Sequence, residues 1–139
     1  MTIEVKIARA RMLLGVPYLH LGRDRNGIDC IGLLAYACAV ESEKVPVYPA
    51  DPVNGELERS LADHFGPAVI RGLPSVDELL VGDVLAIQYR GPVRHVAIVG
   101  DYWLPGHRFS MIHTDAALGR VVEHALDFKW IRRVCAVYR

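Results

Sequence analysis

The chain has no excess of charge of either sign and no long apolar run. Its 139 residues contain 16 basic and 16 acidic side chains. It therefore lacks the basic stripe of a nucleic-acid-binding domain and the polybasic patch of a membrane-surface protein. No segment reaches the roughly 20 apolar residues that a membrane-spanning helix requires. The sequence predicts no nucleic-acid partner and no membrane insertion.

The N-terminal segment also lacks the features of a secretory signal. Residues 1–11 alternate charged and apolar side chains, without the uninterrupted apolar stretch of a signal peptide. We expect synthesis in the cytoplasm, so that action outside the cell needs another route. The length fits a single domain, 1–139, which is large enough to bury a core without disulfides or metal.

Cysteine is scarce, and its placement argues against both a disulfide framework and a metal site. Cys30 and Cys38 lie on one expected helix, about 12 Å apart at 1.5 Å per residue, which is beyond disulfide reach. Cys38 and Cys135 lie in apolar runs and are expected in the core. There is no Cys-x-x-Cys or His-x-x-x-His pair, so we expect no metal.

Helical patterns precede strand patterns along the chain. Thr2 is suited to cap a first helix that extends to about Leu14, and residues 23–26 are expected to form a polar loop. From 41 to 74 the chain carries prolines at 46, 49, 52, 67 and 74, which indicates an irregular excursion. Within it, one short helix is expected with its apolar face formed by Leu57, Leu61 and Phe65.

The last third of the chain predicts a β-meander. Five apolar segments are separated by Gly, Pro and Asp signals, namely Asp83–Tyr89, His95–Val99, Phe109–His113, Arg120–His124 and Val134–Tyr138. Strands joined by such short connections pair antiparallel. Helices followed by a sheet predict an α+β fold in which a central helix packs on one face of a five- to six-stranded antiparallel sheet.

That central helix begins at or beside Cys30. Gly27 is suited to a turn, and Asp29 has the short acceptor side chain of an N-cap. No charged residue occurs from Cys30 to Val40, which predicts a buried helix with only its first turn at a cleft. A helix N-terminus lowers the pKa of a thiol. Cys30 is thus either a nucleophile or a small core residue.

A cysteine nucleophile needs a base and a group that orients the base. His95 opens one expected strand and His113 ends the next, so the two can lie side by side at one edge of the sheet. The backbone N–H of Cys30 is then a candidate oxyanion donor. His64, His107 and His124 lie among polar residues and are expected to be exposed. A structural role for each histidine is the alternative.

Several motifs, in order along the chain, resemble the NlpC/P60 cysteine peptidases. They are Pro17-Tyr18 followed by Gly22, Gly27-Ile28-Asp29-Cys30-Ile31-Gly32-Leu33, Val81-Gly82-Asp83-Val84-Leu85, His95-Val96-Ala97-Ile98-Val99 and Met111-Ile112-His113. Two later runs, Gly119-Arg120-Val121-Val122-Glu123-His124 and Trp130-Ile131-Arg132-Arg133, resemble the phage-encoded branch found among tail genes and in gene transfer agents. The resemblance covers essentially the whole chain.

The resemblance implies a papain-like fold, no metal or organic cofactor, and a phage-type tail as partner and location. The implied activity is hydrolysis of peptidoglycan stem peptides, usually at the bond between γ-D-glutamate and diaminopimelate. Cys30 matches the nucleophile, His95 the base and His113 the third polar residue. Tyr18 matches a tyrosine of the cleft. Asp29 matches a residue that in some relatives holds the free amino terminus of the substrate, while its sequence position equally favours N-capping.

Three departures from the family pattern bear on specificity rather than on the catalytic steps. Ile31 stands where serine is frequent, His20-Leu21-Gly22 replaces Trp-Gly-Gly, and the loop 100–110 is long. They weaken the expectation that the substrate needs a free L-alanine end. Two alternatives to the peptidase stay open: a structural tail-tip or assembly protein that keeps the fold, and an amidase or acyltransferase of the same superfamily.

Overall fold

The computed structural model describes residues 1–49 and 55–139, so that Pro52 of the excursion lies outside the described residues. Four α-helices are present in the described part of the chain: α1 Ile3–Arg11, α2 Cys30–Ala37, α3 Glu56–Phe65 and α4 Phe128–Ile131. The described strands are β1 Arg23–Asp24, β2 Gly27–Ile28, β3 Ile70–Arg71, β4 Val84–Ile87, β5 His95–Gly100, β6 Ser110–His113, β7 Val122–Ala125 and β8 Val134–Tyr138.

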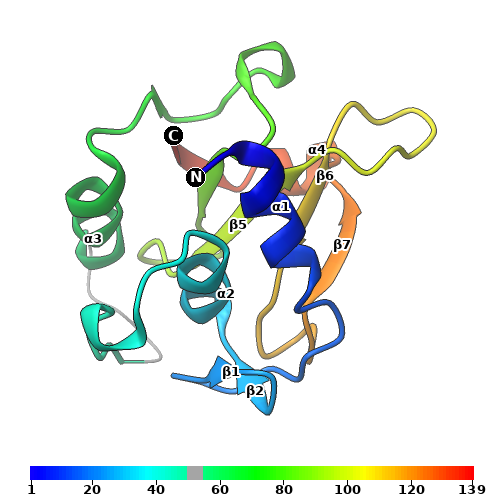
Figure 1. Cartoon of the computed structure of the whole chain (residues 1–139). Coiled ribbons are helices and arrows are strands. Elements are labelled where there is room, and N and C mark those ends of the chain that lie inside the picture. Colours follow the sequence, from blue (N-terminus) through cyan, green and yellow to red (C-terminus); the bar gives the residue numbers. More distant parts are fainter. Residues whose placement is uncertain (50–54) are drawn as a thin grey trace.

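A six-stranded antiparallel sheet organises the fold, in the order β3-β8-β4-β5-β6-β7. Helices α1 and α2 pack against each other, and α2 packs on β5 (Figure 1). The predicted α+β architecture, with the helix that begins at Cys30 on an antiparallel sheet, is confirmed.

Apolar residues line both faces of the sheet. On the helix side, α1 and α2 bury a cluster that includes Ile7, Ala10, Leu33, Leu34, Val96 and Ile98. On the other side, beneath α4, the cluster includes Leu85, Ile87, Val99, Met111 and Ile131. None of the helices in the described segments has the length and apolar character needed to cross a bilayer.

Four local predictions need correction. The last strand, β8, does not extend the meander but returns to pair with β4. Residues 23–26 belong to a two-stranded hairpin, β1-β2, rather than to a plain loop. The excursion contains a short strand, β3, that pairs with β8. Finally, α1 is capped by Thr2 as expected but ends at Arg11, because the next residues form turns that bring the chain to β7.

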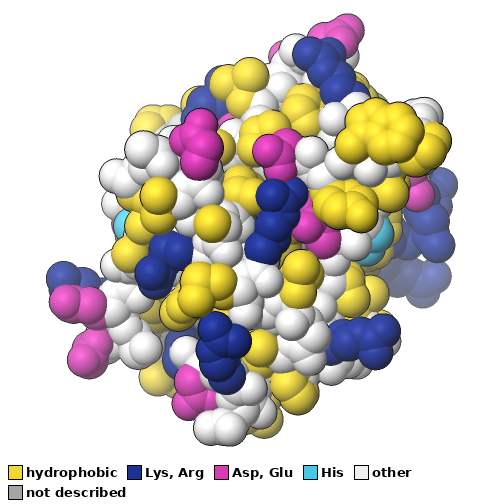
Figure 2. Space-filling view, turned by 45° about the vertical axis from the view of Figure 1, so that its right-hand side comes forward, with side chains coloured by type: hydrophobic (Ala, Val, Ile, Leu, Met, Phe, Trp, Pro, Cys, Tyr) yellow, Lys and Arg dark blue, Asp and Glu magenta, His cyan; other side chains and the backbone are white. Residues whose placement is uncertain are grey.

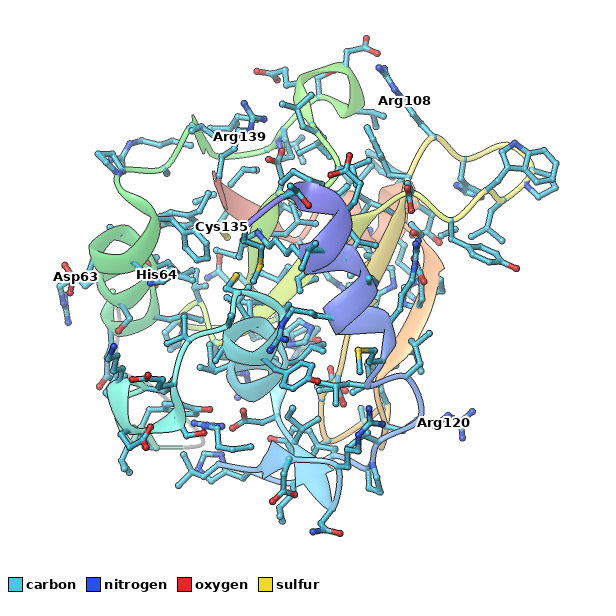
Figure 3. All side chains as sticks on the ribbon, in the orientation of Figure 1. Asp63, His64, Arg108, Arg120, Cys135 and Arg139 are labelled. Atoms are coloured by element: carbon cyan, nitrogen blue, oxygen red, sulfur yellow. The ribbon has the colours of Figure 1, made fainter. Side chains whose placement is uncertain are left out.

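The long loop between β5 and β6 projects from the body of the protein (Figure 1). Its side chains Tyr102 and Trp103 are 58% and 78% exposed. In Figure 2, large hydrophobic side chains stand out at the upper right, the side on which this loop projects, among charged groups of both signs. Arg108, near the end of the loop, points outward and pairs with Asp77 (Figure 3). The sequence-based expectation of a long loop at 100–110 is confirmed.

Candidate active site

Cys30 occupies the first position of α2, and local backbone packing explains why it stands there. Asp29 caps the helix by accepting a 2.8 Å hydrogen bond from the N–H of Gly32. A Cβ on Gly32 would lie 2.4 Å from the carbonyl oxygen of Gly22, and a Cβ on Gly22 would lie 2.2 Å from that of Gly27. These glycines therefore let the β1-β2 hairpin pack directly against the first turn of α2, which holds Cys30 in place.

The carboxylate of Asp29 is buried and surrounded by donors. One oxygen accepts from Gly32 and from the guanidinium of Arg23, at 2.8 Å each. The other accepts from the N–H of Leu21 at 2.8 Å and from the hydroxyl of Tyr48. Of the two roles left open for Asp29, this arrangement favours the N-cap, since both oxygens are already engaged within the chain.

Three histidines form a continuous row on one face of the sheet. Nε2 of His95 lies 2.8 Å from Nδ1 of His113, and Nε2 of His113 lies 2.7 Å from Nε2 of His124. Nδ1 of His124 lies 2.9 Å from the carbonyl oxygen of Ala125. The structure therefore brings His95 and His113 together as the sequence predicted, and adds a third ring.

The prediction that His124 is exposed is wrong. In the β6–β7 register His113 lies opposite Val122, and Met111 lies opposite His124. His113 and His124 are therefore diagonal neighbours on one face, within reach of each other. The ring of Trp130 from α4 packs edge-on against His113, 4.7 Å between centroids, and half-buries His124. By contrast, His107 and His64 are exposed as predicted, the latter beside Asp63 on α3 (Figure 3).

Cys30 lies between two hollows of the surface. One is lined by Cys30 and His95 together with Tyr18, Tyr89 and residues 114–117. The other is lined by Cys30, Tyr18, Asp29, residues 46–49 and the first turns of α3. The proline-rich excursion thus forms one wall of the groove beside the thiol. Cys30 and His95 thus line the same cleft.

Burial sets the protonation of the cysteine and the histidine. It raises the pKa of Cys30 to about 12, against weaker opposing hydrogen bonds to the sulfur from the backbone of Val96 and Ile31. It lowers the pKa of His95 to about 4, against the nearby charge of Asp115. The helix-terminus effect expected for Cys30 is therefore outweighed by burial. At neutral pH the two groups rest as a neutral thiol and a neutral imidazole.

Tyr18 lies in both hollows and keeps its proton. Its ring is half-buried, and burial raises the pKa of its hydroxyl. The hydroxyl is thus a permanent hydrogen-bond donor beside Cys30 at physiological pH. Tyr18 therefore lines the cleft beside Cys30, at the place that the family resemblance implies for it.

The buried histidines make stability depend on acid. Burial lowers the pKa of His95 and of His113 below the ordinary 6.5. As pH falls from about 6.5 toward about 4, these two histidines become protonated in the unfolded chain but stay neutral in the folded chain. We expect the free energy of unfolding to fall by about 1.4 kcal/mol per pH unit for each such histidine. Urea unfolding at pH 7, 6 and 5 measures this slope.

His113→Asn provides the matched comparison for that slope. Asparagine keeps an amide toward His95 but does not titrate, so the slope is expected to be about 1.4 kcal/mol per pH unit shallower. His64→Asn makes the same substitution at an exposed position and serves as the comparison variant. Equal slopes in the parent and in His113→Asn would contradict the buried neutral state of His113.

Comparison with solved structures identifies the fold as that of NlpC/P60 proteins. The chain is similar to an NlpC/P60 family protein from Bacillus cereus ATCC 10987, with a TM-score of 0.63 and 21% identity over 100% of this chain and 40% of that one. It is similar to the NlpC/p60 domain of the peptidoglycan hydrolase SagA, with a TM-score of 0.60 and 21% identity over 100% and 99% of the two chains.

The peptidoglycan hydrolase RipB from Mycobacterium tuberculosis is a third similar structure, with a TM-score of 0.57 and 23% identity over 99% of this chain and 63% of RipB. The chain thus spans less than two thirds of the Bacillus cereus and Mycobacterium tuberculosis proteins. No protein-family model matches the sequence. No curated protein matches it either.

Proposed function

We propose that this chain is a cysteine endopeptidase that hydrolyses peptidoglycan stem peptides, at the bond between γ-D-glutamate and diaminopimelate. The observation that carries the proposal is the juxtaposition of Cys30, at the start of α2, with His95 in one cleft. The shared fold supports the substrate class, because SagA and RipB are peptidoglycan hydrolases.

The mechanism starts from neutral partners. The thiol of Cys30 passes its proton to His95 as the sulfur attacks the substrate carbonyl, which avoids a free buried thiolate. The N–H of Cys30, one of the unpaired donors of a first helical turn, and the hydroxyl of Tyr18 stabilise the oxyanion. His95 then protonates the departing amine, and a water activated by His95 hydrolyses the thioester to release the acyl group.

We also propose that the peptidase is delivered to the cell envelope by a phage-type tail. The support is the resemblance of the runs 119–124 and 130–133 to the phage-encoded branch. In the fold these runs lie around β7 and α4, next to His113. Mass spectrometry of purified tail particles tests this part of the proposal, and the absence of the chain from the particles would contradict it.

The test is a digest of diaminopimelate-type peptidoglycan followed by mass spectrometry of the released fragments. New fragments are expected, and their masses locate the cleaved bond. Protein treated beforehand with iodoacetamide, which blocks the sulfur of Cys30, is expected to release none. If neither the treated nor the untreated protein releases new fragments, the structural tail protein is favoured, and equal release by both would contradict Cys30 as the nucleophile. Fragments cut at an amide other than a stem-peptide bond would favour the amidase alternative.

A further inference from the structure

The row of histidines continues one ring beyond the pair that the proposed mechanism uses. His124 stands on β7, and its two ring nitrogens face Nε2 of His113 on one side and the carbonyl oxygen of Ala125 on the other. His95 and His113 are 2% and 0% exposed, and Trp130 packs against all three rings. Water therefore has little access to the ring nitrogens of His95 and His113.

The end of this row dictates where each proton sits. A carbonyl oxygen only accepts, so Nδ1 of His124 carries its proton. A neutral imidazole has a single N–H, so Nε2 of His124 accepts, and His113 donates to it from Nε2. Nδ1 of His113 is then an acceptor, and His95 donates to it from Nε2. The one nitrogen left with a free lone pair is Nδ1 of His95.

We propose that His124 is a positioning residue that fixes the tautomer of His95, so that Nδ1 of His95 stays unprotonated and available to the thiol of Cys30. The use of that lone pair as the catalytic base rests on the proposed peptidase function, whereas the tautomer itself does not. Without an acceptor at position 124, His113 is free to carry its proton on Nδ1 and donate to His95. His95 would then carry its proton on Nδ1 and cease to be a base.

In the described part of the chain, the charged and titratable groups around the three histidines make no hydrogen bond to their ring nitrogens. Asp115 acts on His95 through its charge, and its carboxylate accepts from the hydroxyl of Tyr89. The ring of Tyr89 stacks on His95, and the guanidinium of Arg133 lies over Trp130. The carbonyl of Ala125 and the ring of His124 therefore set the direction of the row.

The experiment is ¹⁵N NMR of the intact chain with labelled histidines, at pH 7, with each ring assigned through its own carbon atoms. In the parent we expect His95 and His113 protonated on Nε2, and His124 on Nδ1. A parent His95 protonated on Nδ1 overturns the proposal, whatever the variants show. This readout does not require peptidoglycan cleavage, so a correct tautomer in an inactive protein would refute the peptidase and not the positioning role.

Two variants give the matched comparison. His124→Glu supplies an acceptor only and is expected to preserve the parent tautomers, while His124→Leu is expected to produce His95 protonated on Nδ1. The second readout is alkylation of Cys30 by iodoacetamide, located by tandem mass spectrometry. We expect a loss of about tenfold or more in rate for His124→Leu, up to the roughly 10²- to 10⁴-fold that a general base contributes, and a rate close to the parent for His124→Glu. Equal losses of alkylation rate in both variants would contradict the positioning role and leave His124 with a packing role only.

Discussion

Replacing Cys30 with alanine is expected to lower kcat/KM on peptidoglycan stem peptides by about 10⁴-fold or more, which is the scale on which removal of a nucleophile acts. The sulfur of Cys30 lies in the same cleft as His95, and alanine has no atom that can form the thioester. Alanine is also the best helix former. The free energy of unfolding is therefore expected to change by less than about 1 kcal/mol. Fragment analysis of timed digests measures the activity, and urea unfolding measures the stability.

Cys38→Ala is the matched control for this prediction. Cys38 lies at the other end of the same helix, is half-buried like Cys30, and lies away from both hollows that flank the nucleophile. We expect this variant to keep the activity of the parent. Activity in Cys30→Ala equal to that of Cys38→Ala would contradict the assignment of Cys30 as the nucleophile.

The features predicted well from the sequence are those that depend on neighbouring residues. The cap at Asp29 and the helix start at Cys30 follow from a local signal, because a short acceptor side chain satisfies the free N–H groups of the next turn. The side-by-side placement of His95 and His113 follows from the pairing of consecutive strands. Both are present in the structure.

The features that were missed depend on contacts between distant segments. Short connections predict that consecutive strands pair, but nothing local shows that β8 returns to the far edge of β4. His124 was misplaced for a similar reason. Its neighbours in sequence are polar, whereas its burial comes from Trp130 on α4 and from the register of β7 against β6. The available signal was that successive side chains of a strand point to opposite faces of the sheet. Applied to β6 and β7, this alternation puts His124 on the same face as His113.

The role of Asp29 could not be decided from the sequence because its partners come from separate segments. Arg23 lies on the hairpin β1-β2, and Tyr48 lies in the excursion that walls the cleft. The hydroxyl of Tyr48 also receives a 2.9 Å hydrogen bond from Arg23. Only the fold shows that the guanidinium and the phenol meet at the capping carboxylate.

Replacing Asp29 with alanine is expected to destabilise the fold by about 3–5 kcal/mol, the usual effect of removing one partner of a buried ion pair. The change removes the cap of α2 and leaves the Arg23 guanidinium, whose side chain is 19% exposed, without its carboxylate. Asp29→Asn is the milder variant. Asparagine caps helices as well as aspartate does, so the cap is kept, while the charge is lost and an amide nitrogen, which only donates, replaces the oxygen that accepts from Leu21 and Tyr48. Urea unfolding of both variants is expected to give that order of stability.

Asp29→Asn also separates the capping role of Asp29 from a role in binding a substrate amine. If both oxygens of Asp29 serve the fold, Asp29→Asn changes kcat/KM by the same factor for a stem peptide with a free L-alanine amine and for its N-acetylated form. If instead the carboxylate binds the amine, Asp29→Asn loses activity on the free amine alone, since only that substrate carries a positive charge to pair. With Arg23 already neutralising Asp29 at 2.8 Å, we expect the ratio between the two substrates to stay unchanged. A fall in that ratio would mean that the substrate displaces Tyr48 or Arg23 from the carboxylate as it binds.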